Sequence, residues 1–191
     1  QTAFAWDHRP AFVLITGDLV HEGTSADYAR AKTLLQELDE QYHTKTYLAL
    51  GNHDNRENFN SAFREQASDQ PVDYCVQNEW LRWIVLDSSC GQVIGQLSGS
   101  QLAWLEQELC DPTDCPTILA LHHPVYGTTT AETDANNLAT PDRLIRLLQD
   151  HPVDGILCGH SHEATLVTEQ GLPPQFVGAG AASAALPLIQ G

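Results

Sequence analysis

The chain has 191 residues, of which 42% are hydrophobic, so it has enough apolar side chains for one core of ordinary size but not for two. We therefore expect one domain over residues 1–191. Acidic residues number 25 against 9 basic ones, which gives a formal net charge of −16. So acidic a surface repels polyanions, which argues against a nucleic-acid polymer as a partner.

The sequence shows neither a bilayer-spanning apolar run nor a charged-then-apolar leader, so no membrane partner is expected. It begins with Gln1 and contains no methionine, which indicates that the start of the natural protein is missing. Five cysteines without a Cys-x-x-Cys pair favour a reducing, cytoplasmic location. A Cys110–Cys115 bridge stays open as an alternative, and Cys158 is expected to be a small buried hydrophobe.

The first half of the chain alternates strands with helices. Residues 11–16 form a continuous apolar run, which predicts a strand buried on both faces. Ser25 is expected to cap a helix that runs to about residue 40, and residues 46–50 are expected to form the next buried strand. Residues 55–72 carry mixed charge and few strand formers, so a short helix and a loop are expected there.

The second half continues the alternation. Further strands are expected at residues 81–86, 117–121 and 153–158. Helices are expected from Ser98 to Leu109 and from Pro141 to about Asp150, with a polar surface loop over residues 127–140. Residues 165–168 and 175–177 resemble a hairpin around Gly171. This order predicts an α/β fold with a largely parallel sheet, whose ligand sites lie beyond the carboxyl ends of the strands.

Polar strings follow four of the predicted strands. They are Gly17-Asp18, Gly51-Asn52-His53-Asp54, His122-His123-Pro124 and Gly159-His160-Ser161-His162. Taken singly, each string has an ordinary structural explanation as a turn, a loop or a cap. Four of them in one order, each after a buried strand, instead favour ligands that converge at one edge of a sheet.

The residue types in these strings suit the hydrolysis of a phosphate ester. Two cations about 3.5–4 Å apart neutralise the phosphoryl group and activate a water molecule. Asp18 is the candidate to bridge them, because a carboxylate has two oxygens. The imidazoles of His122, His160 and His162 and the amide oxygen of Asn52 complete a ligand set suited to iron, manganese, zinc or cobalt.

On these strings the chain resembles the calcineurin-like metallophosphoesterases, and within them the bacterial class III cyclic-nucleotide phosphodiesterase and glycerophosphodiesterase branch. The resemblance covers nearly the whole chain. The Gly51-Asn52-His53-Asp54 string differs from the Gly-Asn-His-Glu of the protein Ser/Thr phosphatase branch, whereas His122-His123-Pro124 fits the phosphodiesterase branch. The resemblance implies a four-layer αββα sandwich, here truncated at the N-terminus.

The resemblance also implies a binuclear metal site. Asp18 would bridge both ions, Asn52, His122 and His160 would hold one of them, and His162 would bind the other. The family opens with an Asp-x-His string that nothing before Asp18 matches, Asp7-His8 being the nearest pair. Residues 2–6 resemble the end of a helix, so truncation is expected rather than natural loss, and the ion at His162 is expected to be held poorly.

Two further residues of the second string are implied as catalytic. His53 would donate a proton to the leaving alkoxide or stabilise the phosphoryl oxygens, and Asp54 would orient it. A structural role for His53 stays open. His123 and His21 are expected to support the ligands from behind or to lie on the surface.

The predicted activity is therefore that of a metal-dependent phosphodiesterase. Its expected substrate is a small phosphodiester, either a 3',5'-cyclic nucleotide such as cyclic AMP or a glycerophosphodiester, attacked in line by a metal-bound hydroxide. A phosphomonoesterase or nucleotidase on the same metal site stays open, and so does a noncatalytic metal-binding domain. A homo-oligomer is equally open.

Overall fold

The computed structural model describes residues 10–127 and 137–180, so the expected helix end at residues 2–6 and the Asp7-His8 pair lie outside the described residues. The strands are β1 (Val13–Thr16), β2 (Thr46–Ala49), β3 (Tyr74–Gln77), β4 (Arg82–Val85), β5 (Thr117–Ala120), β6 (Gly155–Cys158), β7 (Thr165–Val167) and β8 (Gln175–Val177). The helices are α1 (Ser25–Tyr42), α2 (Arg56–Phe63), α3 (Gly99–Cys110) and α5 (Asp142–Asp150).

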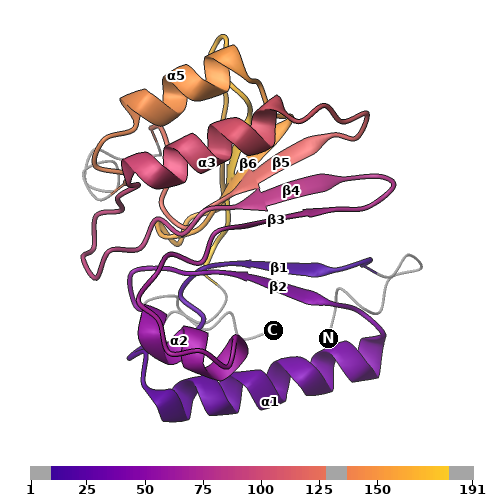
Figure 1. Cartoon of the computed structure of the whole chain (residues 1–191), viewed down its shortest axis with the longest axis vertical. Coiled ribbons are helices and arrows are strands. Elements are labelled where there is room, and N and C mark those ends of the chain that lie inside the picture. Colours follow the sequence, from indigo (N-terminus) through magenta and orange to yellow (C-terminus); the bar gives the residue numbers. More distant parts are fainter. Residues whose placement is uncertain (1–9, 128–136, 181–191) are drawn as a thin grey trace.

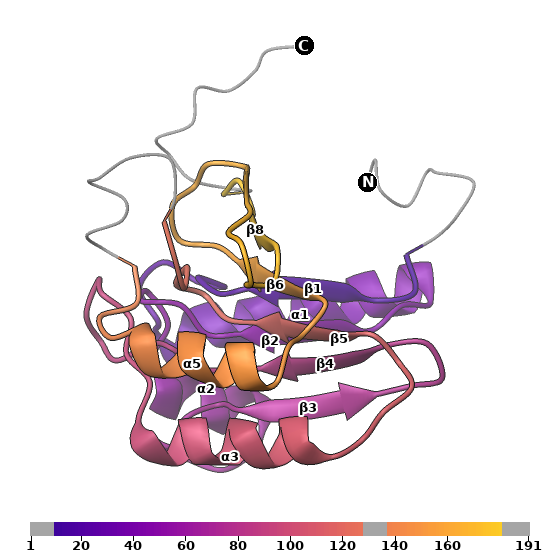
Figure 2. The ribbon, with the colours of Figure 1, turned by 90° about the horizontal axis from the view of Figure 1, so that it is seen from above.

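The strands form two sheets. Strands β1 and β2 pair in parallel, and the larger sheet has the order β3-β4-β5-β6-β8-β7. In the larger sheet β4, β5, β6 and β8 run parallel, as expected, while β3 and β7 are antiparallel strands at its two edges. Figure 2 shows β3, β4, β5 and β6 side by side in this order. The predicted hairpin is confirmed as the β7–β8 pair, whereas β3 was not predicted because it is short and only partly buried.

Helices cover the outer face of each sheet, so the layers run helices, sheet, sheet, helices (Figure 1). Three hydrophobic clusters fill the spaces between these layers. The first packs α3 and α5 on the larger sheet around Leu105, Leu119 and Leu144. The second packs α1 and α2 on β1 and β2, and the third joins the two sheets around Trp83 and Ala120. The expected α/β architecture is therefore confirmed.

The helix starts follow capping chemistry. The α1 helix is capped by Thr24, whose side chain accepts from the Asp27 amide at 3.2 Å while the Asp27 carboxylate accepts from the Thr24 amide. The expectation that Ser25 caps this helix is wrong by one residue, because Ser25 already has helical geometry. Ser98 caps α3 as expected, with Gln101 completing the same reciprocal pair of bonds.

All five cysteines are free thiols, so the alternative of a Cys110–Cys115 bridge is wrong. Cys158 is buried in the cluster under α5, as expected. Within residues 10–127 and 137–180, none of the helices combines the length and apolar character that crossing a bilayer requires.

Candidate metal centre

The predicted ligands lie where strands from both sheets end. Asp18 follows β1, Asn52 follows β2, His122 follows β5, and His160 and His162 follow β6. Because the two sheets pack face to face, the carboxyl ends of these four strands meet at one edge of the molecule. Four loops that are far apart in the sequence therefore contribute to one place.

Three ligand atoms form a tight triangle at this edge. The amide oxygen Oδ1 of Asn52 lies 3.1 Å from His122 Nε2 and 3.0 Å from His160 Nδ1. The two ring nitrogens are 3.2 Å apart, and Asp18 Oδ2 lies 3.4 Å from His122 Nε2. The structure thus brings Asn52, His122 and His160 into mutual contact and places a fourth predicted ligand, Asp18, beside His122.

The tautomer of His122 makes this triangle suitable for a cation. Its Nδ1 lies 2.8 Å from the carbonyl oxygen of Thr16, which can only accept, so Nδ1 carries the proton and Nε2 presents a lone pair. That lone pair faces the Asn52 and Asp18 oxygens, which are themselves acceptors. Ligands that bind one cation at about 2.1 Å and at right angles lie about 3 Å apart, so the triangle fits a divalent metal ion.

The carboxyl group of Asp18 is held in its charged form. Burial by itself would raise its pKa, but the His122 ring, in its protonated form without a bound metal, and the His53 amide, which donates to Oδ1 at 3.0 Å, outweigh burial and lower the pKa to about 2. Asp18 is therefore an anionic oxygen ligand at neutral pH.

Glycines allow these loops to approach one another. A Cβ atom on Gly51 would lie 2.2 Å from Asp18 Oδ1, and one on Gly17 would lie 2.4 Å from His122 Nδ1. Gly159 is also close, since its Cβ would lie 2.9 Å from the carbonyl oxygen of Thr16. The glycine that opens three of the four strings is thus required by packing around the ligands.

His162 shares a cavity with the other ligands. This open cavity of about 270 Å³ is lined by five predicted site residues, namely Asp18, Asn52, His53, His160 and His162. Two residues that were not predicted, Val93 and Ser161, complete its wall. The His122 ring is buried behind them.

His53 lies at the cavity wall with its ring held from behind. Its Nδ1 lies 3.0 Å from the main-chain oxygen of His21, and the His21 ring stacks on it with centroids 4.9 Å apart. Because a carbonyl oxygen accepts, Nδ1 donates, which leaves Nε2 for a ligand in the cavity.

Asp54 has different neighbours from those expected. Its Oδ2 accepts from the amides of Leu19 and Gly51 at 3.2 and 2.9 Å, and its Oδ1 accepts from the Tyr28 hydroxyl at 2.9 Å. The expectation that Asp54 orients the His53 ring is therefore corrected, because that ring bonds to the main chain instead. Burial raises the pKa of Asp54 despite these bonds. Its carboxylate ties together the loops that carry Asp18 and Asn52.

His123 supports the centre from behind. Its nearest ring nitrogen comes within 4.8 Å of those of His122 and His160. Both of its own nitrogens are nevertheless engaged, with Ser88 Oγ at 2.8 Å from Nδ1 and the Val93 carbonyl at 3.1 Å from Nε2. Burial and the neighbouring histidines lower the pKa of His123 to about 3, so its ring is neutral. His123 therefore anchors a loop, which agrees with the supporting position expected from the sequence.

The sequence reasoning missed three residues around the centre, namely Ser88, Val93 and Ser161. A signal for Ser88 was present, because it follows the predicted strand at residues 81–86 just as the ligand strings follow theirs. No comparable pattern marks Val93. Ser161 lies between two predicted ligands, and its buried hydroxyl has no hydrogen-bond partner among the described residues.

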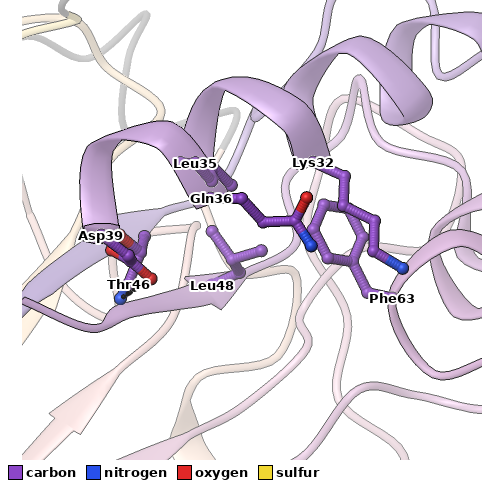
Figure 3. A pocket seen from close by; sticks show the side chains of 7 residues that line it. All are labelled: Lys32, Leu35, Gln36, Asp39, Thr46, Leu48 and Phe63. Atoms are coloured by element: carbon purple, nitrogen blue, oxygen red, sulfur yellow. Dashed lines mark hydrogen bonds between the residues drawn. The ribbon is translucent and has the colours of Figure 1, made fainter. Parts of the chain in front are cut away.

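A second cavity, of about 160 Å³, lies between α1, α2 and β2 (Figure 3). Its polar groups serve the fold: Lys32 donates to the carbonyl of Ala62 at 2.6 Å, and the Asp39 carboxylate accepts from the amide and hydroxyl of Thr46. It contains none of the predicted ligands. The cavity at the strand ends is therefore the candidate site.

Comparison with known proteins agrees with this fold. Residues 3–164 match the family described as calcineurin-like phosphoesterase, and the chain belongs to this family. Members of the family use divalent metal ions, and the contacts among Asn52, His122 and His160 suit such an ion.

Similar proteins of known description are bacterial phosphodiesterases. The chain is 38% identical over 167 residues to a probable cyclic nucleotide phosphodiesterase of Rhodococcus erythropolis, a match that covers 86% of this chain and 56% of that protein. It is 35% identical to a cAMP/cGMP dual specificity phosphodiesterase of Mycobacterium tuberculosis, over 86% of this chain and 52% of that protein. A glycerophosphodiester phosphodiesterase of Enterobacter lignolyticus is 33% identical, over 83% and 58% respectively. The chain thus matches a little over half the length of these relatives.

Among solved structures, a dimetal phosphatase from Danio rerio superposes with a TM-score of 0.70 over 88% of this chain and 72% of that one. The sequence identity in this match is 18%, so the likeness shows a shared fold.

Proposed function

We propose that the chain is a metal-dependent phosphodiesterase that hydrolyses a small phosphodiester, either a 3',5'-cyclic nucleotide or a glycerophosphodiester. The observation that carries this proposal is the contact among Asp18, Asn52, His122 and His160, which four strands of two sheets bring to one cavity. The phosphodiesterase functions ascribed to the bacterial relatives support the diester as substrate. In this proposal residues 1–191 form one domain, and its layers are the αββα sandwich of the family.

Each predicted ligand has a role in the proposed site. Asn52, His122 and His160 would hold one ion, His162 would hold a second, and the Asp18 carboxylate would contribute to both. When bound, such ions neutralise the nonbridging phosphoryl oxygens and activate water for attack at phosphorus. The Thr16 carbonyl keeps the lone pair of His122 Nε2 directed at the Asn52 and Asp18 oxygens, among which the first ion would be held.

The proton for the leaving oxygen comes from His53 in this proposal. Its Nδ1 hydrogen is fixed on the His21 carbonyl, so in the doubly protonated ring Nε2 carries the proton that the leaving alkoxide takes, and the ring is left neutral. The His53 main-chain amide also donates a hydrogen bond to the Asp18 carboxylate. The position of the proton donor His53 is therefore linked to that of the metal ligand Asp18. Asp54 accepts hydrogen bonds from the amides of Leu19 and Gly51, and so holds the loop after β1 against the loop after β2.

The substitution Asn52→Ala tests the proposed site. It removes the oxygen that forms one corner of the ligand triangle, so we expect bound Mn²⁺ to fall and kcat/KM to drop by at least about tenfold. Asn52→Asp keeps an oxygen at this position and should retain metal. Metal content by mass spectrometry and initial rates on cyclic AMP measure both effects.

The substrate class is tested on the same preparations. The unmodified chain should hydrolyse cyclic AMP or glycerophosphoethanolamine faster than p-nitrophenyl phosphate in the presence of Mn²⁺. A faster rate on the monoester would favour a phosphomonoesterase, and unchanged metal content and activity in Asn52→Ala would contradict the site itself.

A further inference from the structure

Val93 differs from every other residue at the wall of the metal cavity. It is the one aliphatic side chain among the seven that line this cavity, and the others are polar or charged. Val93 is 55% exposed, so no hydrophobic core accounts for its place. An apolar side chain that faces an otherwise polar cavity gains free energy only if an apolar part of a ligand covers it.

The segment that carries Val93 is tied to the scaffold on both sides. His123 Nε2 donates to the Val93 carbonyl at 3.1 Å, and Gln96 donates through its amide to the Ser88 carbonyl at 2.9 Å. The Gly95 amide donates to the carbonyl of Asn137 at 3.1 Å, and the thiol of Cys90 donates to the Ile94 carbonyl. Val93 is therefore held at a fixed place beside the ligands, since His123 directly follows His122 in the chain.

The fixed position of Val93 affects whether the cavity suits a cyclic nucleotide or a glycerophosphodiester better. A phosphodiester held at the ligand triangle would extend its organic groups into the cavity, and Val93 is one of the residues that line this cavity. A nucleobase offers a flat, weakly hydrated face to such a side chain, whereas glycerol and ethanolamine offer hydroxyl and ammonium groups. We propose that Val93 is a specificity-determining residue that contacts the nucleobase, so that the site favours a cyclic nucleotide over a glycerophosphodiester. This inference rests on the proposed phosphodiesterase function.

The substitution Val93→Thr tests the contact, because threonine has nearly the shape of valine but carries a hydroxyl group in place of one methyl group. We expect kcat/KM for cyclic AMP to fall about three- to tenfold, with kcat/KM for glycerophosphoethanolamine changing less than about twofold. Ile94→Thr is the matched control. Ile94 is 40% exposed and adjacent in the chain but does not line the cavity, so both substrates should keep their rates.

The outcomes separate this inference from the proposed function. A selective loss on cyclic AMP supports the contact. An equal loss on both substrates, no loss on either, or the same selective loss in Ile94→Thr overturns it while leaving the phosphodiesterase proposal intact. If the unmodified chain hydrolyses neither diester with Mn²⁺, the proposed function fails and the inference fails with it.

Discussion

Three of the predicted ligands adopt a backbone conformation that non-glycine residues rarely use. Asp18, His160 and His162 have φ angles of +53°, +72° and +58°. Such left-handed residues cost of order 1 kcal/mol each and persist where the surroundings hold them in place. Their concentration at the strand ends indicates that the loops are built to direct these side chains into the cavity rather than to minimise local strain.

Gly17→Ala should damage the site through packing. Its φ is +98°, and the new Cβ would lie 2.4 Å from His122 Nδ1, so we expect a loss of about 2–3 kcal/mol in stability and a fall in bound Mn²⁺. Gly171→Ala is the control, because its φ is +80° but no atom lies within 4 Å of the added Cβ. It should cost about 1 kcal/mol and leave metal binding unchanged. Urea unfolding and metal analysis distinguish the two; equal effects would show that the contact with His122 is unimportant.

Two carboxylates, of which Asp87 is buried and Asp73 is partly buried, join the elements behind the site. Asp87 follows β4 and accepts from Arg56 Nε at 2.7 Å and from the Val72 amide at 3.0 Å, which ties α2 to the larger sheet. Asp73, just before β3, accepts from the Asp87 amide and from Gln101 Nε2 of α3 through one oxygen, Oδ1. These hydrogen bonds fix α2, α3 and β3 relative to β4, although no local sequence pattern indicates that these elements are neighbours.

Asp73→Asn should stabilise the protein at neutral pH. Burial raises the pKa of Asp73 above its ordinary value of 3.8, so the unfolded state releases its proton first and stability falls as pH rises above about 3.8. Asparagine keeps the accepting oxygen without the charge. The urea midpoint of the variant should therefore exceed that of the parent at pH 7, and the difference should shrink towards pH 4.

The control for this prediction is Asp114→Asn, since Asp114 is exposed on the loop before β5. The urea midpoint of Asp114→Asn should equal that of the parent protein both at pH 7 and near pH 4. A lower midpoint for Asp73→Asn at pH 7 would mean that the ionised carboxylate contributes more than its burial costs.

At the scale of the whole molecule, the contact between the sheets makes the site. Trp83 lies in this contact, stacked on Phe12 with centroids 4.6 Å apart and edge-on to Tyr47 at 4.8 Å. Asp18 and Asn52 come from the smaller sheet, whereas His122 and His160 come from the larger one. The spacing of the ligands therefore depends on how the two sheets pack.

Trp83→Ala should weaken both stability and metal binding. Trp83 is 2% exposed, so its truncation should cost about 3–5 kcal/mol and loosen the register between the sheets. Trp80→Ala is the matched control, because Trp80 is 69% exposed in the β3–β4 turn and its loss should change neither property. Thermal unfolding and Mn²⁺ titration measure the two effects. Full metal affinity in a folded Trp83→Ala variant would show that the sheets hold their register without this side chain.

The sequence by itself determined the elements and the order of the ligand strings, because apolar runs and the polar residues after them are local features. It identified Asp18, Asn52, His122 and His160 from their places after strands, and the structure brings these four into contact. Their roles, with those of His53 and His162, stay predictions. The antiparallel edge strand β3 was not predicted, because three half-buried residues and one exposed residue give no continuous apolar signal.

Only the tertiary structure decided what surrounds these ligands. The bond between His122 and the Thr16 carbonyl joins residues 106 positions apart, and Asp54 meets Leu19 across 35 positions. The burial of His123 and the place of Val93 at the cavity wall likewise follow from how loops pack. Such contacts leave no periodicity in the chain, since periodicity records which face of an element is buried but not which distant residue covers it.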